Sequence, residues 1–313
     1  MKIKQIKTSV GATEASGVTR QGNDLLIVSD AAPGVYYSLD ISGERGPLIS
    51  LLREKVVRHE LPGAALALDF ESVDILADGR VVALSERLRA LIGASGLIFQ
   101  YDDPLSEFGE RGLEGLAIRP GQNGASEVAV LWEGGWIEDG EVQAQIRRRL
   151  GDPLLPIVLI HELQPGEANL KVLIEDDEEL VELRVPQPDR DKDGWRFRAP
   201  DLVWHQWRGE GGANELGFIV LLNSQTAREI PGKPKFGPRW LQRFDRMGNP
   251  VGSHLDLDEE AKRLLGDNRL QGANWEGLGW YEAGKRLVLV YDASDSIDNI
   301  PVALVIDLPG SWS

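Results

Sequence analysis

Short runs of apolar residues, each ending on a polar residue, recur along the whole chain. Runs of this length that are rich in Val, Leu and Ile predict β-strands buried on both faces. Five of the runs end on an acid or an amide, at Asp30, Glu86, Glu133, Asn223 and Asp292. Each run is preceded at a similar distance by another acid: Glu14, Glu71, Glu114, Asp201 and Glu276. The chain therefore contains five units of one kind.

One phrase of the sequence returns almost unchanged in two of these units. Residues 111–118 read Arg-Gly-Leu-Glu-Gly-Leu-Ala-Ile, and residues 274–280 read Asn-Trp-Glu-Gly-Leu-Gly-Trp. A phrase that recurs together with the strand behind it indicates a repeat architecture. Five hairpin units in 313 residues are typical of a β-propeller, in which four-stranded sheets surround a central channel. We predict an all-β fold, a single β-propeller domain over residues 1–313 with five blades. Six blades, with a degenerate one before residue 200, are the alternative.

Local patterns predict further elements. Residues 2–7 alternate like a strand, and we expect them to pair with the last apolar segment, residues 302–308, and so to close the ring. A proline at the start of residues 47–54 predicts a short helix there. Early acids, late basic residues and Gly266 predict another helix over residues 259–265. The long third unit predicts an excursion over one face between residues 133 and 152.

The charge of the chain restricts its partners. The net charge is −16, and such a surface repels nucleic acid and anionic membranes, which bind to Lys/Arg patches. We therefore expect a monomer that binds a small-molecule ester or phosphoester, or a protein partner, and neither nucleic acid nor membrane. The absence of cysteine excludes disulfides and thiolate metal sites. The basic N-terminus is followed by no apolar stretch, so no secretory signal is expected. The compartment stays open between the cytoplasm and a mature exported form.

The acids that open the five units form the first candidate site. In a propeller, the innermost strand of each blade starts at the channel, so these acids are expected to form one ring. Converging carboxylates repel each other, and a hard cation with oxygen ligands resolves that conflict. We predict that calcium, or another divalent cation, is bound by Glu14, Glu71, Glu114, Asp201 and Glu276. The alternative is that each acid accepts hydrogen bonds from a neighbouring blade and is a structural latch.

The acids that end the runs form the second candidate set. Glu86 and Glu133 are candidate general bases for hydrolysis. Arg87 follows Glu86, and its guanidinium suits an anionic phosphoester. The alternatives are that these acids only begin turns and that Glu86 and Arg87 form a structural ion pair. A G-x-S-x-G elbow and a P-loop are both absent from the sequence, so a serine hydrolase and a nucleotide-binding protein lack support.

The stretch over residues 108–117, Phe-Gly-Glu-Arg-Gly-Leu-Glu-Gly-Leu-Ala, resembles the most typical stretch of the "esterase-like activity of phytase" propeller domains. Residues 69–73, 84–87 and 274–278 fit the same pattern, and the match is poor from about residue 134 to residue 200. The resemblance implies a propeller, a divalent cation (calcium by analogy) and hydrolysis of phosphate or other esters.

Three functional hypotheses follow from these observations. The first is a calcium-binding propeller that acts as a metal-dependent hydrolase of esters or phosphoesters. The second is a non-catalytic binding propeller with a structural ion in its channel, whose contacts with a partner lie in the long third unit and in the loop over residues 233–235. The third is a lactonase-like hydrolase of sugar acids, which would use the same acids and metal on another substrate.

Overall fold

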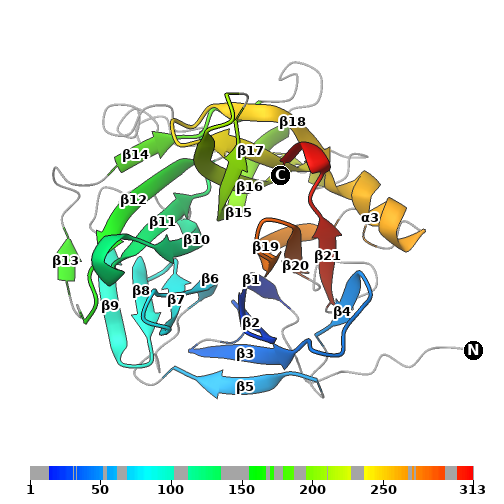
Figure 1. The fold of residues 1–313 in the computed structure, drawn as a ribbon. Coiled ribbons are helices and arrows are strands. Elements are labelled where there is room, and N and C mark those ends of the chain that lie inside the picture. Colours follow the sequence, from blue (N-terminus) through cyan, green and yellow to red (C-terminus); the bar gives the residue numbers. More distant parts are fainter. Residues whose placement is uncertain are drawn as a thin grey trace, which may run out of the picture.

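Five sheets, antiparallel apart from one strand pair, surround a central axis in the computed structural model (Figure 1). The structure describes residues 14–30, 32, 34–51, 55–61, 69–101, 112–134, 155–166, 170–172, 179–186, 195–209, 211–226, 236–266, 270, 273–292 and 302–312. The protein is thus an all-β propeller, and the five blades predicted from the repeats are confirmed. None of the described helices is both long and apolar enough to cross a bilayer.

Each blade runs outward from a strand next to the axis. Blade 1 consists of β1 (Ala15–Gln21), β2 (Asp24–Ser29), β3 (Val35–Asp40) and β5 (Val57–Glu60). Blade 2 consists of β6 (Phe70–Ile75), β7 (Val81–Ser85), β8 (Ala90–Gly93), β9 (Gly96–Tyr101) and β13 (Leu170–Val172). Blade 3 consists of β10 (Leu113–Pro120), β11 (Ser126–Trp132), β12 (Ile157–Leu163) and β14 (Glu179–Glu182). Blade 4 consists of β15 (Trp195–Arg208), β16 (Asn214–Thr226), β17 (Phe236–Asp245) and β18 (Pro250–Asp256). Blade 5 consists of β19 (Asn274–Glu282), β20 (Arg286–Asp292), β21 (Val302–Asp307) and β4 (Leu48–Ser50).

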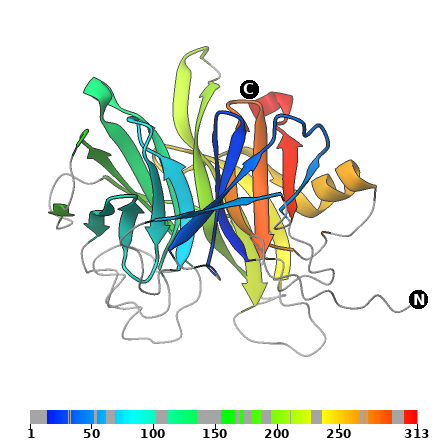
Figure 2. The same ribbon diagram turned by 90° about the horizontal axis from the view of Figure 1, so that it is seen from below.

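The second strand of each blade is a continuous apolar run because both of its faces are covered. In β2, Ile27 packs in a core shared with Val288 of blade 5, whereas the next residue, Val28, packs in a core shared with Val73 of blade 2. Successive side chains of a strand point to opposite faces, so neighbours along β2 enter different cores. The inner strands of blades 1 and 5 run side by side along the molecule (Figure 2).

The ring is closed by β4, which leaves blade 1 between β3 and β5 and pairs with β21 of blade 5. Ile49 lies opposite Ala303 and is completely buried. This corrects two predictions. Residues 48–50 form a strand where a helix over 47–54 was expected, because the pairing edge of β21 outweighs the local helix signal. The place next to β21 that was expected for residues 2–7 is taken by β4; residues 2–7 themselves lie outside the described residues.

The irregular third unit contributes to two blades. Its strand β14 completes blade 3, and β13 pairs in parallel with β9 at the outer edge of blade 2. The described residues of this region form no sixth sheet. Most of the expected excursion, residues 135–152, and the loop over 233–235 lie outside the described residues.

The one α-helix in the described part of the chain, α3 (Leu257–Leu265), begins two residues before its expected start. Asp256 caps its N-terminus by accepting hydrogen bonds from the N–H groups of Asp258 and Glu259, and Gly266 ends it in the left-handed conformation with φ of 71°. Two short 3-10 helices, η2 (Gln122–Gly124) and η4 (Gly310–Trp312), complete the described elements. The prediction of a helix over residues 259–265 is confirmed.

Candidate functional site

The inner strands carry bulges where the acids of the repeated phrase lie. In β6, β10 and β19 the register with the next strand shifts by one residue, and the extra residues are Glu71, Glu114 and Glu276. A β-bulge redirects the extra side chain and is frequent at functional sites. These three glutamates therefore lie at equivalent points at the start of their blades, as the repeated phrase predicts.

Two of the five predicted ring acids are not equivalent to these glutamates. In β1 the extra residue is Ser16, so Glu14 lies two positions earlier and forms an isolated bridge with Asp292. In β15 the register shifts between Arg198 and Asp201, and Asp201 pairs with Leu221 after the shift. The equivalence of Glu14 and Asp201 with the other three acids was therefore wrong, because a bulge position leaves no mark in the hydrophobic pattern.

Six of the carboxylates that interact at this end of the channel form what we call the acidic mouth: Asp69, Glu71, Glu86, Glu114, Glu133 and Glu276. The charges of Asp30 and Asp292 act on the mouth as well. Burial raises the pKa of Glu71 well above its usual range, with a further increase from the charge of Glu86. Burial also raises the pKa of Glu114, and the charges of Glu133 and Glu71 add to the effect. The mouth thus concentrates negative charge where water is scarce, as the sequence led us to expect of a ring of acids.

Three of these side chains form a compact group of oxygens on blade 2. Asp69, Glu71 and Glu86 each offer a carboxylate oxygen, and the three oxygens lie within 4.8 Å of one another. All three residues are partly exposed. Gly112 faces this group, and a Cβ atom at that position would collide with the Glu86 side chain. Close packing of Glu86 against the backbone of blade 3 therefore requires glycine there.

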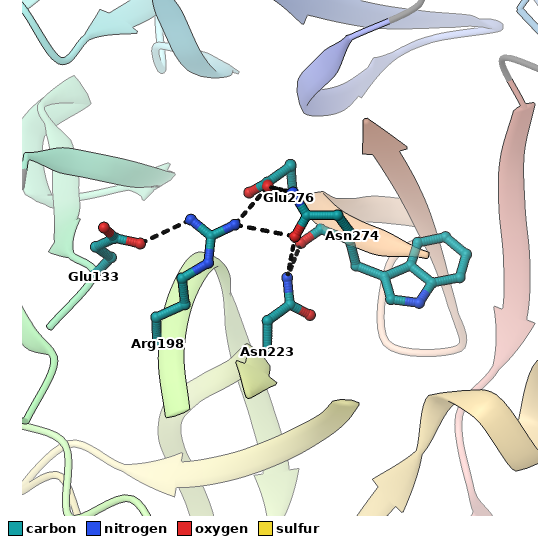
Figure 3. A network of polar contacts seen from close by, with 6 residues as sticks. Glu133, Arg198, Asn223, Asn274 and Glu276 are labelled. Atoms are coloured by element: carbon teal, nitrogen blue, oxygen red, sulfur yellow. Dashed lines mark hydrogen bonds and ion pairs between the residues drawn. The ribbon is translucent and has the colours of Figure 1, made fainter. Parts of the chain in front are cut away.

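A single guanidinium joins Glu133 and Glu276 across three blades (Figure 3). Arg198 of β15 donates from Nη1 to Glu133 Oε2 at 2.9 Å and from Nη2 to Glu276 Oε1 at 2.5 Å. It also donates to Asn274 Oδ1 at 3.1 Å, and Asn274 in turn donates to Glu276. Asn223 donates to Asn274 Oδ1 at 3.4 Å and to the carbonyl of Trp275.

Arg198 and Glu276 shift each other's pKa in opposite directions: the guanidinium lowers the pKa of the carboxyl, and the carboxylate raises the pKa of the guanidinium. Burial raises the pKa of Glu276 to about 7 even though Arg198 opposes the shift. The three surrounding glutamates, Glu276 first, raise the pKa of Arg198 against the effect of its burial. Arg198 is therefore always charged and supplies the mouth with one fixed positive charge.

Arg87 extends from the same corner of blade 2 but does not enter this network in the described structure. Its backbone N–H donates to Asp69 Oδ1 at 3.3 Å, and its side chain is exposed. The exposed guanidinium at the rim contrasts with Arg198, whose side chain is only 12% exposed. The Glu86-Arg87 pair in the sequence therefore identified the more exposed arginine, Arg87, and not Arg198.

Asp201 lies below the mouth on the axis and is completely buried. Its Oδ1 accepts hydrogen bonds from the N–H groups of Leu202 at 2.9 Å and Leu116 at 3.3 Å, and its Oδ2 accepts one from Leu278 at 2.7 Å. Ser72 Oγ donates to Oδ1 at 3.4 Å. These contacts tie blade 4 to blades 2, 3 and 5, so Asp201 forms the latch that the sequence analysis held open as an alternative.

A second carboxylate, Asp74, forms a similar latch further along the axis. It accepts hydrogen bonds from the N–H groups of Ile75 at 2.8 Å and Ile118 at 2.6 Å, and from Thr19 Oγ1 at 3.0 Å. Burial raises its pKa to about 6, although these donors oppose the shift. Asp74 belongs to the phrase after Glu71, but nothing in the sequence separates a latch from a ligand.

Sequence reasoning missed Arg198 and did not assign a role to Asp69. Asp69 directly precedes β6 and lies two residues before Glu71. Arg198 has no such signal, because it belongs to a region that breaks the repeat and is followed by Pro200. Three of the predicted ligands, Glu71, Glu114 and Glu276, therefore meet the predicted bases Glu86 and Glu133 at one place, and Arg198 lies beside Glu133 and Glu276.

The chain matches no protein-family model and no curated relative. Solved structures with a similar chain path include virginiamycin B lyase from Staphylococcus aureus, with 11% identity, 95% of this chain and 96% of that chain covered, and a TM-score of 0.41. A thermostable family-43 glycoside hydrolase has 11% identity, 97% and 92% coverage, and a TM-score of 0.46. The calcium-binding protein regucalcin from Agrobacterium tumefaciens has 11% identity, 95% and 92% coverage, and a TM-score of 0.38. At such identities and TM-scores, a shared activity does not follow.

Proposed function

We propose that the acidic mouth binds a divalent cation, calcium by preference, and that Asp69, Glu71 and Glu86 are its protein ligands. The observation that carries this proposal is the approach of three carboxylate oxygens within 4.8 Å of one another. Like charges held this close repel one another, and a cation between them relieves the repulsion. Carboxylate oxygens are the ligands that calcium prefers, and calcium tolerates their irregular geometry.

The surroundings of the three residues fit a cation of this kind. All the donors are hard oxygens, and neither histidine nor cysteine belongs to the group. The missing Cβ at Gly112 leaves Glu86 room to lie against the other two acids. Glu114 adds a fourth carboxylate nearby, since the charges of Glu71 and Glu86 both raise its pKa. The resemblance of the repeated phrase to phytase-like propeller domains supports the same cation.

We further infer that the mouth hydrolyses small esters or phosphoesters. A divalent cation, when bound, polarises an ester or phosphoryl oxygen and lowers the pKa of water beside it. Glu276 is suited to hold or release a proton near neutral pH, because its pKa is raised to about 7. Glu133, a predicted base, is instead bound to Arg198 and keeps that guanidinium in place. Arg87, exposed at the rim, is suited to contact an anionic group of the substrate.

Calorimetric titration of chelator-treated protein with calcium tests the cation site. Glu71→Gln and Glu86→Gln should each weaken binding at least about tenfold, or about 1.4 kcal/mol. The matched control is Glu60→Gln, which removes a carboxylate that is 73% exposed on β5 and should leave binding unchanged. If the parent protein and all three variants bind calcium with equal affinity, Glu71 and Glu86 are not ligands of the cation.

A substrate panel with and without calcium tests the hydrolase. It should contain phosphomonoesters, carboxyl esters and sugar lactones, since a lactonase-like activity would use the same acids on another substrate. We expect calcium-dependent turnover that Glu276→Gln reduces at least about a hundredfold, in the range of general acid–base catalysis. Absence of calcium-dependent turnover above the Glu71→Gln background would reject the hydrolase and leave the cation site intact.

The second candidate is a non-catalytic binding propeller in which the cation is a structural staple. Asp201 and Asp74 favour it, because they show that carboxylates in this channel join blades through backbone N–H groups. In that case calcium should raise stability by about 2.7 kcal/mol at a hundredfold excess over the dissociation constant, without any turnover in the panel. Such a propeller would act by binding a protein partner through its faces.

A further inference from the structure

Each of the three bulges that carry a mouth glutamate has one contact with the Asp201 carboxylate. Leu116, two residues after Glu114, donates its N–H to Oδ1 at 3.3 Å, and Leu278, two residues after Glu276, donates its N–H to Oδ2 at 2.7 Å. Ser72, the residue after Glu71, donates its hydroxyl to Oδ1 at 3.4 Å. The Asp201 side chain therefore accepts a hydrogen bond from a residue within two positions of each of the three bulge glutamates.

The Asp201 carboxylate is completely buried and packs closely against blade 3. A Cβ atom on Gly115 would lie 2.9 Å from the Cα atom and 3.0 Å from Oδ1 of Asp201. Residues at the corresponding position of the other inner strands are small: Gly17, Ser72, Gly115 and Gly277. Blade 4 differs, because it has Asp201 at this position. The residue before Asp201 is Pro200, where blades 2, 3 and 5 have a glutamate.

We propose that Asp201 is a positioning residue for the cation site, which sets the distances between the glutamates of the mouth by holding their three bulges at once. The inference rests on the proposed cation site and deepens it. It also reassigns Asp201, which the sequence analysis expected among the metal ligands: its oxygens are occupied by four donors below the mouth. A cation ligand needs free oxygen lone pairs directed at the ion, and Asp201 directs its lone pairs at N–H and O–H groups.

The variant Asp201→Asn separates positioning from packing, because Asn has nearly the same volume. Its amide has one acceptor oxygen instead of two, so either Leu278 or Leu116 must face an NH2 group. The bulge that loses its acceptor moves, and the glutamate on it moves as well. We expect calcium affinity, measured by calorimetry, to fall about tenfold, or about 1.4 kcal/mol.

Asp74→Asn is the matched control. Asp74 also accepts from its own next residue, from a hydroxyl group and from the N–H of a neighbouring inner strand. Its partner in β10 is Ile118, four residues from Glu114, whereas Leu116 is two residues away. This substitution should lower the urea midpoint of unfolding about as much as Asp201→Asn does, and should change calcium affinity less than about twofold, or about 0.4 kcal/mol.

A milder pair of variants keeps the test decisive if Asp201→Asn does not fold. Ser72→Ala removes the hydroxyl that contacts Asp201, and Thr19→Ala removes the hydroxyl that contacts Asp74. Ser72→Ala should weaken calcium binding about threefold, or about 0.6 kcal/mol, and Thr19→Ala should leave it unchanged.

Two results would overturn the proposal in different ways. If the parent protein binds calcium and the members of each pair weaken binding equally, Asp201 is an ordinary latch and the cation site stands without it. If the parent protein binds no divalent cation, the proposed function fails, and the positioning role fails with it. A larger loss of affinity in Asp201→Asn and Ser72→Ala than in their controls, at similar loss of stability, supports the proposal.

Discussion

Arg198 donates a hydrogen bond of 2.5 Å to Glu276, and this contact joins blade 4 to blade 5 at the acidic mouth. Both side chains are largely buried, with 12% and 15% exposure. Removal of one partner of such a pair leaves the other charge without compensation, which is far more costly than loss of a surface pair.

Arg198→Met should therefore lower the free energy of unfolding by about 3–5 kcal/mol at neutral pH. Urea unfolding at several pH values measures the effect, which should shrink on acidification as the acids freed from Arg198 take up protons. The control Arg58→Met removes an exposed ion pair with Glu60 and should cost less than about 1 kcal/mol. A similar small loss for both variants would show that the mouth does not depend on Arg198.

The metal-free protein should become less stable as pH rises through the neutral range. Burial raises the pKa of Glu71, Glu114 and Glu276, and for Glu276 the raised value is about 7. The folded state therefore binds more protons than the unfolded chain, whose glutamates titrate near about 4.3. The stability that these groups contribute is fully present below that pH and is lost as pH rises through their folded-state values.

Thermal unfolding in chelator, between about pH 5 and pH 8, measures this dependence. Glu276→Gln should reduce the slope by up to about 1.4 kcal/mol per pH unit, the effect of one proton. Saturating calcium should reduce the slope as well, because a bound cation favours the ionised carboxylates. A slope that neither calcium nor Glu276→Gln changes would mean that other groups titrate.

Gly112→Ala should weaken calcium binding without a comparable loss of stability. The new Cβ would collide with the Glu86 side chain, which is a flexible side chain and can move away, but only by leaving Asp69 and Glu71. We expect calcium affinity to fall at least about tenfold, as for direct loss of a ligand. Gly43→Ala is the control, because a Cβ there meets nothing within 4 Å. Unchanged affinity in Gly112→Ala would remove Glu86 from the set of ligands.

Because β4 closes the ring, replacement of Ile49 should strongly lower the stability of the protein. This side chain is completely buried in blade 5, and its replacement by Ala should cost about 2–5 kcal/mol, which differential scanning calorimetry or urea unfolding would measure. Val57→Ala on β5, where the side chain is 59% exposed, should cost less than about 0.5 kcal/mol. Deletion of residues 2–7 should leave β21 paired with β4. If this deletion is as damaging as Ile49→Ala, closure depends on both segments.

The five blades could be predicted from the sequence because each blade repeats the same local pattern. The buried run from Leu25 to Ser29 and its counterparts mark the second strands, and Glu71, Glu114 and Glu276 mark the start of the inner strands. The helix α3 was predictable for the same reason, since its cap residues are adjacent to it in the chain. Local signals of this kind need no knowledge of distant partners.

The remaining features depend on contacts between distant residues. Ile49 pairs with Ala303 although proline and the polar residues around it favour a helix. Ser16 rather than Glu14 occupies the bulge of β1, because a bulge is defined by the partner strand and not by the strand itself. Arg198 reaches Glu133 and Glu276 from a strand that departs from the repeat, so no spacing rule identified it.

The excursion of β4 from blade 1 to blade 5 has a consequence for the order in which the protein folds. A ribosome makes residues 48–50 well before their partner in β21, residues 302–304. Blades 2, 3 and 4 contain no strand from outside residues 70–256, so they can form while synthesis continues. The last pairing must then join distant parts of the chain, and such non-local contacts form slowly. Until it forms, the outer edge of β21 stays open to pairing with another chain.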